Sequence, residues 1–230
     1  MKRKCGLEIV RNYDLSKSES SRETTCPPEK KAAIVESLKH FKKSDKNDKK
    51  DEIGMNFLET ERLVLRNVKA GDAAIIHDYR NNEVCGKYQR GQIKDYDGIA
   101  ELVEKRKNDV FGVDDPFMLA VALKGTDEMV GEIVIMPKNG TISLGYTFSY
   151  RYHRKGYAYE SLSALISLLH ERYPEWDFVS FVERENVPSI NLLLKLGYTN
   201  MGYISQMKSQ VFGKWTNSAT EKEIAEAIQK

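Results

Sequence analysis

The stretch 141–173 constrains the fold most, because it predicts a strand that runs through a glycine turn directly into a helix. Apolar and polar residues alternate over 141–150, as in a half-buried strand, and apolar residues then recur at helical spacing. Gly156 lies between the two elements, beside Arg154 and Lys155. A glycine there lets backbone amides approach an anion, and the helix N-terminus adds unpaired donors. The turn is therefore either a phosphate or pyrophosphate site, or a tight turn with solvated basic residues.

Residue patterns on both sides of this stretch predict short strands and helices. We expect strands at 58–68, 117–123, 129–136, 141–150 and 178–183, helices at 99–107, 158–173 and 187–196, and a terminal hairpin around Gly213. A further helix should run through Ile75, Ile76 and Tyr79, with Asp72 as its N-cap. A strand meander followed by β-α-β-α predicts an α/β fold around one sheet.

Asn186 belongs to a second motif, between the expected strand 178–183 and the expected helix 187–196. Pro188 suits the first turn of that helix, and Gly197 suits the position just after its end. Asn186 is then an N-cap whose side chain accepts a backbone hydrogen bond. Alternatively its amide contacts a ligand that lies between two parallel strands. The two roles can coexist.

Residues 1–54 differ in composition from the rest of the chain. They contain 14 Lys and Arg and 10 Asp and Glu, with few apolar positions. Such a segment buries too little apolar surface to offset the entropy lost on ordering, so we expect a charged, flexible N-terminal extension. One piece, 28–41, has apolar residues at helical spacing and is alternatively a helix that docks on a partner. Residues 55–230 are expected to form the folded domain.

Charge and residue usage argue against several classes of protein. The 36 basic and 34 acidic residues nearly balance, which gives no electrostatic reason to expect nucleic acid or an anionic membrane as a partner. No apolar run approaches the roughly 20 residues of a membrane helix, and the N-terminus does not resemble a secretory signal, so we expect a cytoplasmic protein. Cys5, Cys26 and Cys85 form no CxxC pair, and the histidines show no ligand spacing, so neither a disulfide framework nor a metal site is expected.

Ordered motifs within residues 57–219 match one known family. His153-Arg154-Lys155-Gly156-Tyr157-Ala158 matches the pattern Gln/Arg-x-x-Gly-x-Gly/Ala, and Asn186, Ser189 and Lys195-Leu196-Gly197-Tyr198 match an Asn-x-x-Ser/Ala stretch that leads to Lys-x-Gly-Phe/Tyr. The opening segment LETERLVLR and the closing segment VFGKWTNSA are also typical of this family. On these residues the chain resembles the GNAT superfamily of N-acetyltransferases, close to its branch of ribosomal-protein N-terminal acetyltransferases.

The resemblance implies a fold, a co-substrate and its site. The fold would be of the α/β (α+β) type: a single mixed, mostly antiparallel sheet with a central parallel strand pair and helices on both faces. The glycine turn would hold the pyrophosphate of acetyl-CoA, the end of the preceding strand would hydrogen-bond the pantetheine, and the second motif would line the opposite wall. The residues of the turn that would hold the pyrophosphate are Arg154, Lys155, Gly156, Tyr157, Ala158 and Tyr159. Those at the strand end are Phe148 and Tyr150, and those of the opposite wall are Asn186 and Ser189.

Three departures from the family pattern leave the proton-transfer groups open. His153 replaces the Gln or Arg that opens the turn, which is tolerable because the contacts there are largely made by the backbone. Ser143 stands where some members carry a general-base glutamate, and Leu193 where many carry a general-acid tyrosine. The replacement candidates are Glu132, Glu83, Glu183, Tyr146 and Tyr198. Glu132 leads, because a charge inside an apolar strand is unfavourable unless it faces a cleft.

Three functions are compatible with the sequence. The leading hypothesis is an acetyl-CoA-dependent N-acetyltransferase, a monomer or homodimer, that acts on a peptide N-terminus, a polyamine or another small amine. Ser143 and Leu193 motivate the alternative of a non-catalytic module that binds acyl-CoA. A third hypothesis, an RNA- or ribosome-associated protein, is weakened because residues 1–54 carry a net charge of only +4 (14 − 10).

Overall fold

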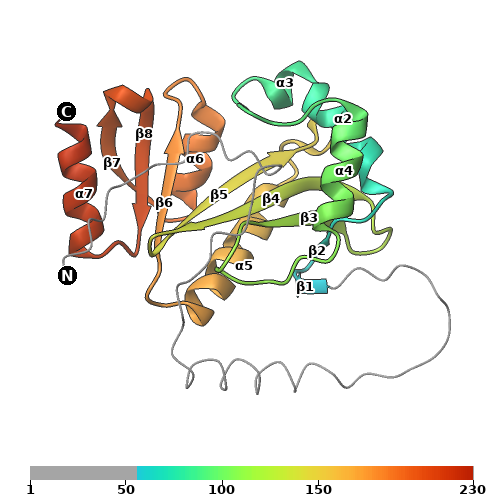
Figure 1. Ribbon diagram of the computed structural model, residues 1–230, viewed down its shortest axis with the longest axis horizontal. Helices are drawn as coiled ribbons and strands as arrows, with labels where there is room; N and C mark the ends of the chain where they lie inside the picture. The colour runs from blue at the N-terminus through green and yellow to red at the C-terminus, as the bar shows by residue number, and fades with distance from the viewer. Residues whose placement is uncertain (1–55, 230) are drawn as a thin grey trace. The chain divides into compact units, whose positions relative to one another are not determined.

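The structure is a computed structural model that describes residues 56–229 (Figure 1). The predictions for 1–54, which include the helix at 28–41, lie outside the described residues, as do Cys5 and Cys26. Between residues 56 and 229, no helix is both long and apolar enough to cross a bilayer.

The described chain alternates strands and helices much as its residue patterns predict. In chain order they are β1 (Asn56–Glu59), β2 (Leu63–Asn67), α2 (Asp72–Asn81), α3 (Glu83–Gly86), α4 (Tyr96–Arg106), β3 (Phe117–Leu123), β4 (Met129–Lys138), β5 (Thr141–Phe148), α5 (Tyr157–Arg172), β6 (Asp177–Val182), α6 (Val187–Lys195), β7 (Thr199–Ile204), β8 (Ser209–Lys214) and α7 (Ser218–Ile228). Short 3-10 turns lie at Tyr150–Tyr152 and Ser205–Met207.

The strands form a single sheet in the order β1-β2-β3-β4-β5-β6-β8-β7. Neighbouring strands are antiparallel except for β5 and β6, which are parallel and pair only at Thr141 with Asp177 and at Ile142 with Phe178. A parallel pair needs a crossover connection, and α5 supplies it. This arrangement confirms the predicted mixed, mostly antiparallel sheet with one central parallel pair.

Apolar clusters lie on both faces of the sheet. Side chains alternate along β3, so Phe117 and Leu119 pack with α5, whereas Met118 and Ala120 pack with α2 and α4. Because both faces of β3 are buried, its sequence is apolar throughout instead of alternating. A third cluster, around Ile224 of α7, packs against β6 and β8. The prediction of helices on both faces is therefore confirmed.

Three predicted elements differ in the structure. The stretch 58–68 is divided between β1 and β2 by a turn in which the Thr60 amide donates to the Leu63 carbonyl at 2.9 Å. Asp72 is the first residue of α2 and Gly71 is the cap, while the Asp72 carboxylate pairs with a buried arginine. The terminal hairpin turns at 205–208, so Gly213 lies inside β8, and α7 follows as a helix that the residue pattern did not reveal.

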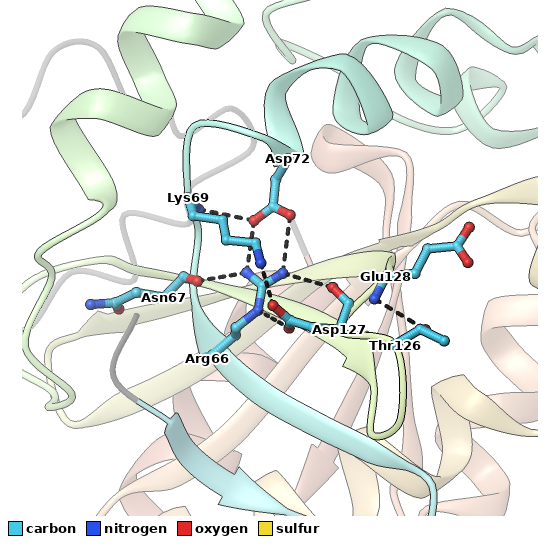
Figure 2. A network of polar contacts seen from close by, with 7 residues as sticks. All are labelled: Arg66, Asn67, Lys69, Asp72, Thr126, Asp127 and Glu128. Carbon is cyan, nitrogen blue, oxygen red and sulfur yellow. Dashed lines mark hydrogen bonds and ion pairs between the residues drawn. The ribbon is translucent and has the colours of Figure 1, made fainter. Parts of the chain in front are cut away.

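Arg66 is that buried arginine, and its network joins three elements (Figure 2). Its guanidinium contacts Asp72 at the start of α2 at 2.8 Å and Asp127 in the β3–β4 turn at 2.6 Å. Lys69 also pairs with Asp127. Partial burial opposes ionisation of Asp127, but hydrogen bonds from Lys69 and Arg66 outweigh it and hold the pKa of this carboxyl below its usual value. Arg66 thus links β2 with the start of α2 and with the β3–β4 turn.

Candidate active site

A cleft opens where β5 and β6 separate after Ile142. Ser143 bridges the start of the gap, because its Oγ donates to the Val179 carbonyl at 2.6 Å. The cleft has a volume of about 1310 Å³, and both strands, the glycine turn, α6 and the segment that follows α3 line it. Ser143 stands where some family members carry a general-base glutamate, and its hydroxyl here links β5 to β6 at the point where the two strands separate.

The glycine turn lines this cleft with a strained backbone and free amides. Arg154 and Gly156 both adopt positive φ, +60° and +83°. The first α5 hydrogen bond runs from the Glu160 amide to the Gly156 carbonyl, so the amides of residues 157–159 precede the helical ladder. Within the described chain no side chain caps α5, whereas Asn186 caps α6. These donors and the helix dipole can bind an anion in the cleft.

The edge of β5 presents backbone carbonyls toward the cleft. Gln89 Nε2 donates to the Tyr146 carbonyl at 3.0 Å, and His153 Nε2 donates to the Phe148 carbonyl at 2.9 Å. The Cys85 thiol also donates to the Phe148 carbonyl, at 3.3 Å. Side chains therefore satisfy acceptors that a neighbouring strand would otherwise pair. His153 therefore acts here through its side chain, whereas the sequence led us to expect that the contacts at this turn are made largely by the backbone.

The second motif forms the opposite wall. Asn186 Oδ1 accepts a hydrogen bond from the Ser189 amide at 3.3 Å, which confirms the predicted N-cap. Ser189 Oγ lies 2.7 Å from the Tyr146 hydroxyl, so the two side chains connect α6 with β5. Burial raises the pKa of Tyr146, because an ionised phenol would lose its hydration. The pair therefore keeps a hydroxyl proton in the cleft at neutral pH.

Glu132 lines the cleft, but its carboxylate is engaged in an ion pair. The side chain is nearly fully buried, and Arg80 of α2 contacts its two oxygens at 3.0 and 2.7 Å. Gln92 Nε2 donates to Glu132 at 3.2 Å and to Thr147 Oγ1 at 3.0 Å. A buried carboxylate needs such a partner, and loss of either charge would leave the other unpaired.

Of the other proton-transfer candidates, Glu83 and Glu183 also line the cleft, whereas Tyr198 is not among its lining residues. Glu83 is exposed at the start of α3, and Glu183 pairs with Arg90 at 2.5 Å. Tyr198 is buried, which raises its pKa well above the ordinary value. Leu193, at the position of the family tyrosine, is part of the apolar core.

The structure places eight of the predicted co-substrate residues on the cleft and two beside it. Those on the cleft are Phe148, Arg154, Gly156, Tyr157, Ala158, Tyr159, Asn186 and Ser189. The Lys155 ammonium lies over the ring of Tyr152, 4.8 Å from its centroid, and Tyr150 packs against the cluster of α2 and α4. In the described part of the chain, no group of three His, Cys, Asp or Glu side chains could hold a metal ion.

Segment 87–92, which we call the bridging segment, contacts both sides of the cleft, and the sequence did not point to it. Tyr88 donates to the Glu185 carbonyl at 2.7 Å, while Gln89 and Gln92 reach β5 as described above. Its residues, KYQRGQ, have no regular hydrophobic spacing, so periodicity predicts only a loop. Its role depends on side chains that meet partners about 40 to 100 residues away in the chain.

Comparison with known proteins assigns the family. Residues 62–199 match the family model described as an acetyltransferase (GNAT) domain. An uncharacterized N-acetyltransferase of Bacillus subtilis, YnaD, is 24% identical over 149 residues, which cover 64% of this chain and 85% of that protein. Among solved structures, RimL, a ribosomal L7/L12 alpha-N-protein acetyltransferase, shares 14% identity, with a TM-score of 0.60 over 70% of this chain and 94% of its own.

A second solved neighbour was crystallised with acetyl-CoA. It is the microcin C7 self-immunity acetyltransferase MccE, in complex with acetyl-CoA and AMP, and it is 14% identical. Its TM-score is 0.57, over 67% of this chain and 93% of that chain. At such low identity both structures show a shared fold, and the family model, which spans more than half of the chain, shows the membership. This chain belongs to the GNAT family of acetyltransferases.

Proposed function

We propose that the protein transfers an acetyl group from acetyl-CoA to a primary amine while both substrates are bound. One observation carries the proposal: the uncapped N-terminus of α5 and the part of β5 beyond Ile142, which β6 does not pair, line the same cleft. The helix start offers amide donors to a pyrophosphate, and the Tyr146 carbonyl, which accepts one hydrogen bond from Gln89, keeps a second lone pair for an amide of a pantetheine arm.

The cleft suits acetyl-CoA in size and chemistry. Its volume of about 1310 Å³ exceeds the roughly 300–1,000 Å³ of ordinary small-molecule pockets, as a long ligand requires. Arg154 and Lys195 add positive charge to the lining. Residues 154–159 would hold the pyrophosphate, Phe148 the pantetheine, and Asn186 and Ser189 the opposite side. When bound, acetyl-CoA supplies an activated acetyl thioester.

The state of Cys85 supports direct transfer to the amine. Burial raises the pKa of this thiol, and a thiol that stays protonated is a poor nucleophile. An acetyl-cysteine intermediate is therefore disfavoured at the one cysteine of the described residues. The hydroxyl pair Tyr146–Ser189 can donate a proton inside the cleft, since burial keeps Tyr146 protonated. We assign it the role of general acid.

Because Glu132 and Ser143, the two candidate positions for a general base, are already engaged, we favour an acceptor amine that is partly neutral in solution. Glu132 is paired with Arg80, and Ser143 donates its proton to Val179. An α-amine with a pKa of about 7.7–8.0 is roughly 10–20% neutral at pH 7, whereas a lysine side chain at about 10.4 is only roughly 0.04% neutral. We therefore propose an α-amine, such as a peptide N-terminus, in preference to a polyamine.

Thiol release from acetyl-CoA in the presence of different amines tests this function. The panel contains peptides with free N-termini, the same peptides with blocked N-termini, and polyamines. We expect release with the free peptides and much less with the blocked ones. Tight CoA binding by calorimetry, without thiol release from any amine, would instead support a non-catalytic acyl-CoA-binding module.

The pH dependence of the reaction tests the assignment of proton transfer. If the acceptor loses its proton before it binds, kcat/KM rises with pH and levels off near the pKa of each amine. We expect the apparent pKa to follow the amine across substrates, and Glu132→Gln to reduce kcat/KM less than about tenfold, or roughly 1.4 kcal/mol. A single apparent pKa near 6–7 for all amines, abolished in Glu132→Gln, would establish an enzyme base and contradict this assignment.

A further inference from the structure

The turn between β1 and β2 contacts the first turn of α5, about 100 residues further along the chain. Thr60 Oγ1 donates to Glu160 Oε1 at 2.6 Å, and the Arg62 amide donates to the same oxygen at 2.9 Å. Arg62 Nε and Nη2 lie 2.7 and 2.6 Å from Glu160 Oε2. Both carboxylate oxygens of Glu160 are thus held by the β1–β2 turn. We call Thr60, Arg62 and Glu160 the clamp.

Arg62 extends the clamp to the glycine turn itself. Its Nη1 donates to the Lys155 carbonyl at 3.0 Å, and its guanidinium lies over the ring of Tyr157, 4.8 Å from the centroid. In a trans peptide the carbonyl and the following N–H point in opposite directions. Because Arg62 fixes the Lys155 carbonyl, the amide of Gly156 points away from the clamp, and Gly156 lines the cleft.

The clamp also controls the charge beside this turn. Glu160 would place a negative charge in the first turn of the helix that is proposed to receive a pyrophosphate. Partial burial opposes ionisation of Glu160, but hydrogen bonds from Thr60 and Arg62 outweigh it and hold the pKa of the carboxyl below its usual value. Arg62 offsets the resulting charge at a distance short enough for a bidentate pair.

The clamp acts on the cleft indirectly. Thr60, Arg62 and Glu160 are not among the described residues that line the cleft. Their contacts reach the turn where Arg154 has a φ of +60°, a conformation that is unfavourable for a side chain other than glycine and that surrounding contacts must maintain. The clamp supplies such contacts from the opposite side of the turn.

We propose that the clamp positions the glycine turn for phosphate binding, so that Thr60, Arg62 and Glu160 determine affinity for the pyrophosphate part of CoA. This inference rests on the proposed use of acetyl-CoA. The clamp residues are positioning residues, and their effect on affinity should be confined to ligands that carry the pyrophosphate.

Calorimetry with two ligands tests the clamp on the full chain. CoA carries the pyrophosphate, and pantetheine has the same thiol arm without it. The variants are Arg62→Lys, which keeps the charge but cannot contact Glu160 and Lys155 together through a planar fork, and Glu160→Gln. Thr60→Val removes one hydroxyl and serves as a milder change. The control is Glu59→Gln at the end of β1, next to the turn, which removes a partner of Lys124 (3.0 Å).

We expect Arg62→Lys and Glu160→Gln to raise the Kd for CoA at least tenfold and to leave the Kd for pantetheine within twofold. Thr60→Val should act in the same direction to a smaller extent, and Glu59→Gln should bind both ligands as the wild type does. Equal weakening of both ligands, or an unchanged Kd for CoA in both clamp variants, would overturn the inference. Failure of the wild type to bind CoA would refute the proposed function, and this inference with it.

Discussion

At the scale of single residues, we expect backbone conformation to matter more to the proposed phosphate site than side-chain charge. Gly156 and Gly140 have the same φ, +83°, but only Gly156 lies on the cleft. A Cβ at Gly156 would come within 3.3 Å of Arg62 Nη2, whereas a Cβ at Gly140 would meet open space. The two glycines therefore allow the effect of backbone strain to be separated from the effect on the site.

Gly156→Asp is expected to weaken CoA binding strongly, by at least about tenfold (roughly 1.4 kcal/mol). The substitution adds a Cβ in the left-handed region, 3.3 Å from Arg62 Nη2, and puts a carboxylate beside the turn whose amides are proposed to bind the anion. Calorimetry with CoA measures the effect. Gly140→Asp is the matched control, because it introduces the same residue at the same φ and should leave the Kd unchanged. Equal Kd values for Gly156→Asp and the wild type would contradict the phosphate assignment.

At the scale of elements, buried ion pairs fasten the helices to the sheet. Arg66 joins β2 to α2 and to the β3–β4 turn, and Arg80 of α2 pairs with Glu132 of β4. In each pair at least one charge is almost completely buried, so removal of its partner leaves an uncompensated charge. α2 is thereby held at two points, at its N-terminus and near its C-terminus.

Arg66→Met is expected to lower the free energy of unfolding by about 3–5 kcal/mol, because it leaves Asp72 buried without its partner. Denaturant titration measures the loss, and Arg66→Met combined with Asp72→Asn should recover part of it. Lys124→Met is a suitable control: its pair with Glu59 is half exposed on both sides, and such pairs contribute about 0–1 kcal/mol. A loss in Arg66→Met no larger than in this control would show that the network is not needed for stability.

At the scale of the whole molecule, the described domain has an apolar core on both faces of its sheet. Among residues 56–229, the apolar clusters draw on side chains from Phe57 to Ile228. The cleft is likewise lined by residues from Glu83 to Glu223. The segment 1–54, with its charged composition, remains the part for which we propose a role separate from folding.

Residues 55–230 alone are expected to fold with the melting temperature of the full chain and to bind CoA with the same Kd. The reason is compositional, because 24 of the 54 preceding residues (14 + 10) are charged and bury little apolar surface. Differential scanning calorimetry of both lengths checks it. A decrease of several degrees, which corresponds to 1 kcal/mol or more for a domain of about this size, would show that the extension stabilises the domain.

Local patterns determined most of the elements and part of the site. Helical spacing and alternation located α5, β5 and α6, and the glycine turn and the Asn186 cap follow from residues that are neighbours in sequence. Such features depend on short-range sterics and hydrogen bonds, which the sequence states directly. The division of 58–68 into two strands was missed because its turn, 60–63, contains no Gly, Pro, Asn or Asp to mark it. Helix α7 was missed because its few apolar residues pack against strands elsewhere in the chain.

Only the tertiary structure decided which polar groups are engaged. Glu132 in an apolar strand suggested a base, but Arg80 and Gln92, which lie 52 and 40 residues away, hold its carboxylate. Ser143, Gln89 and the clamp likewise find partners that are distant in the chain. A side chain's chemistry depends on its burial and its neighbours, and these are fixed only when separate segments pack together. The sequence alone therefore determined the fold and located the glycine turn that we propose binds acetyl-CoA, and the packing decided which polar side chains are already engaged by other residues.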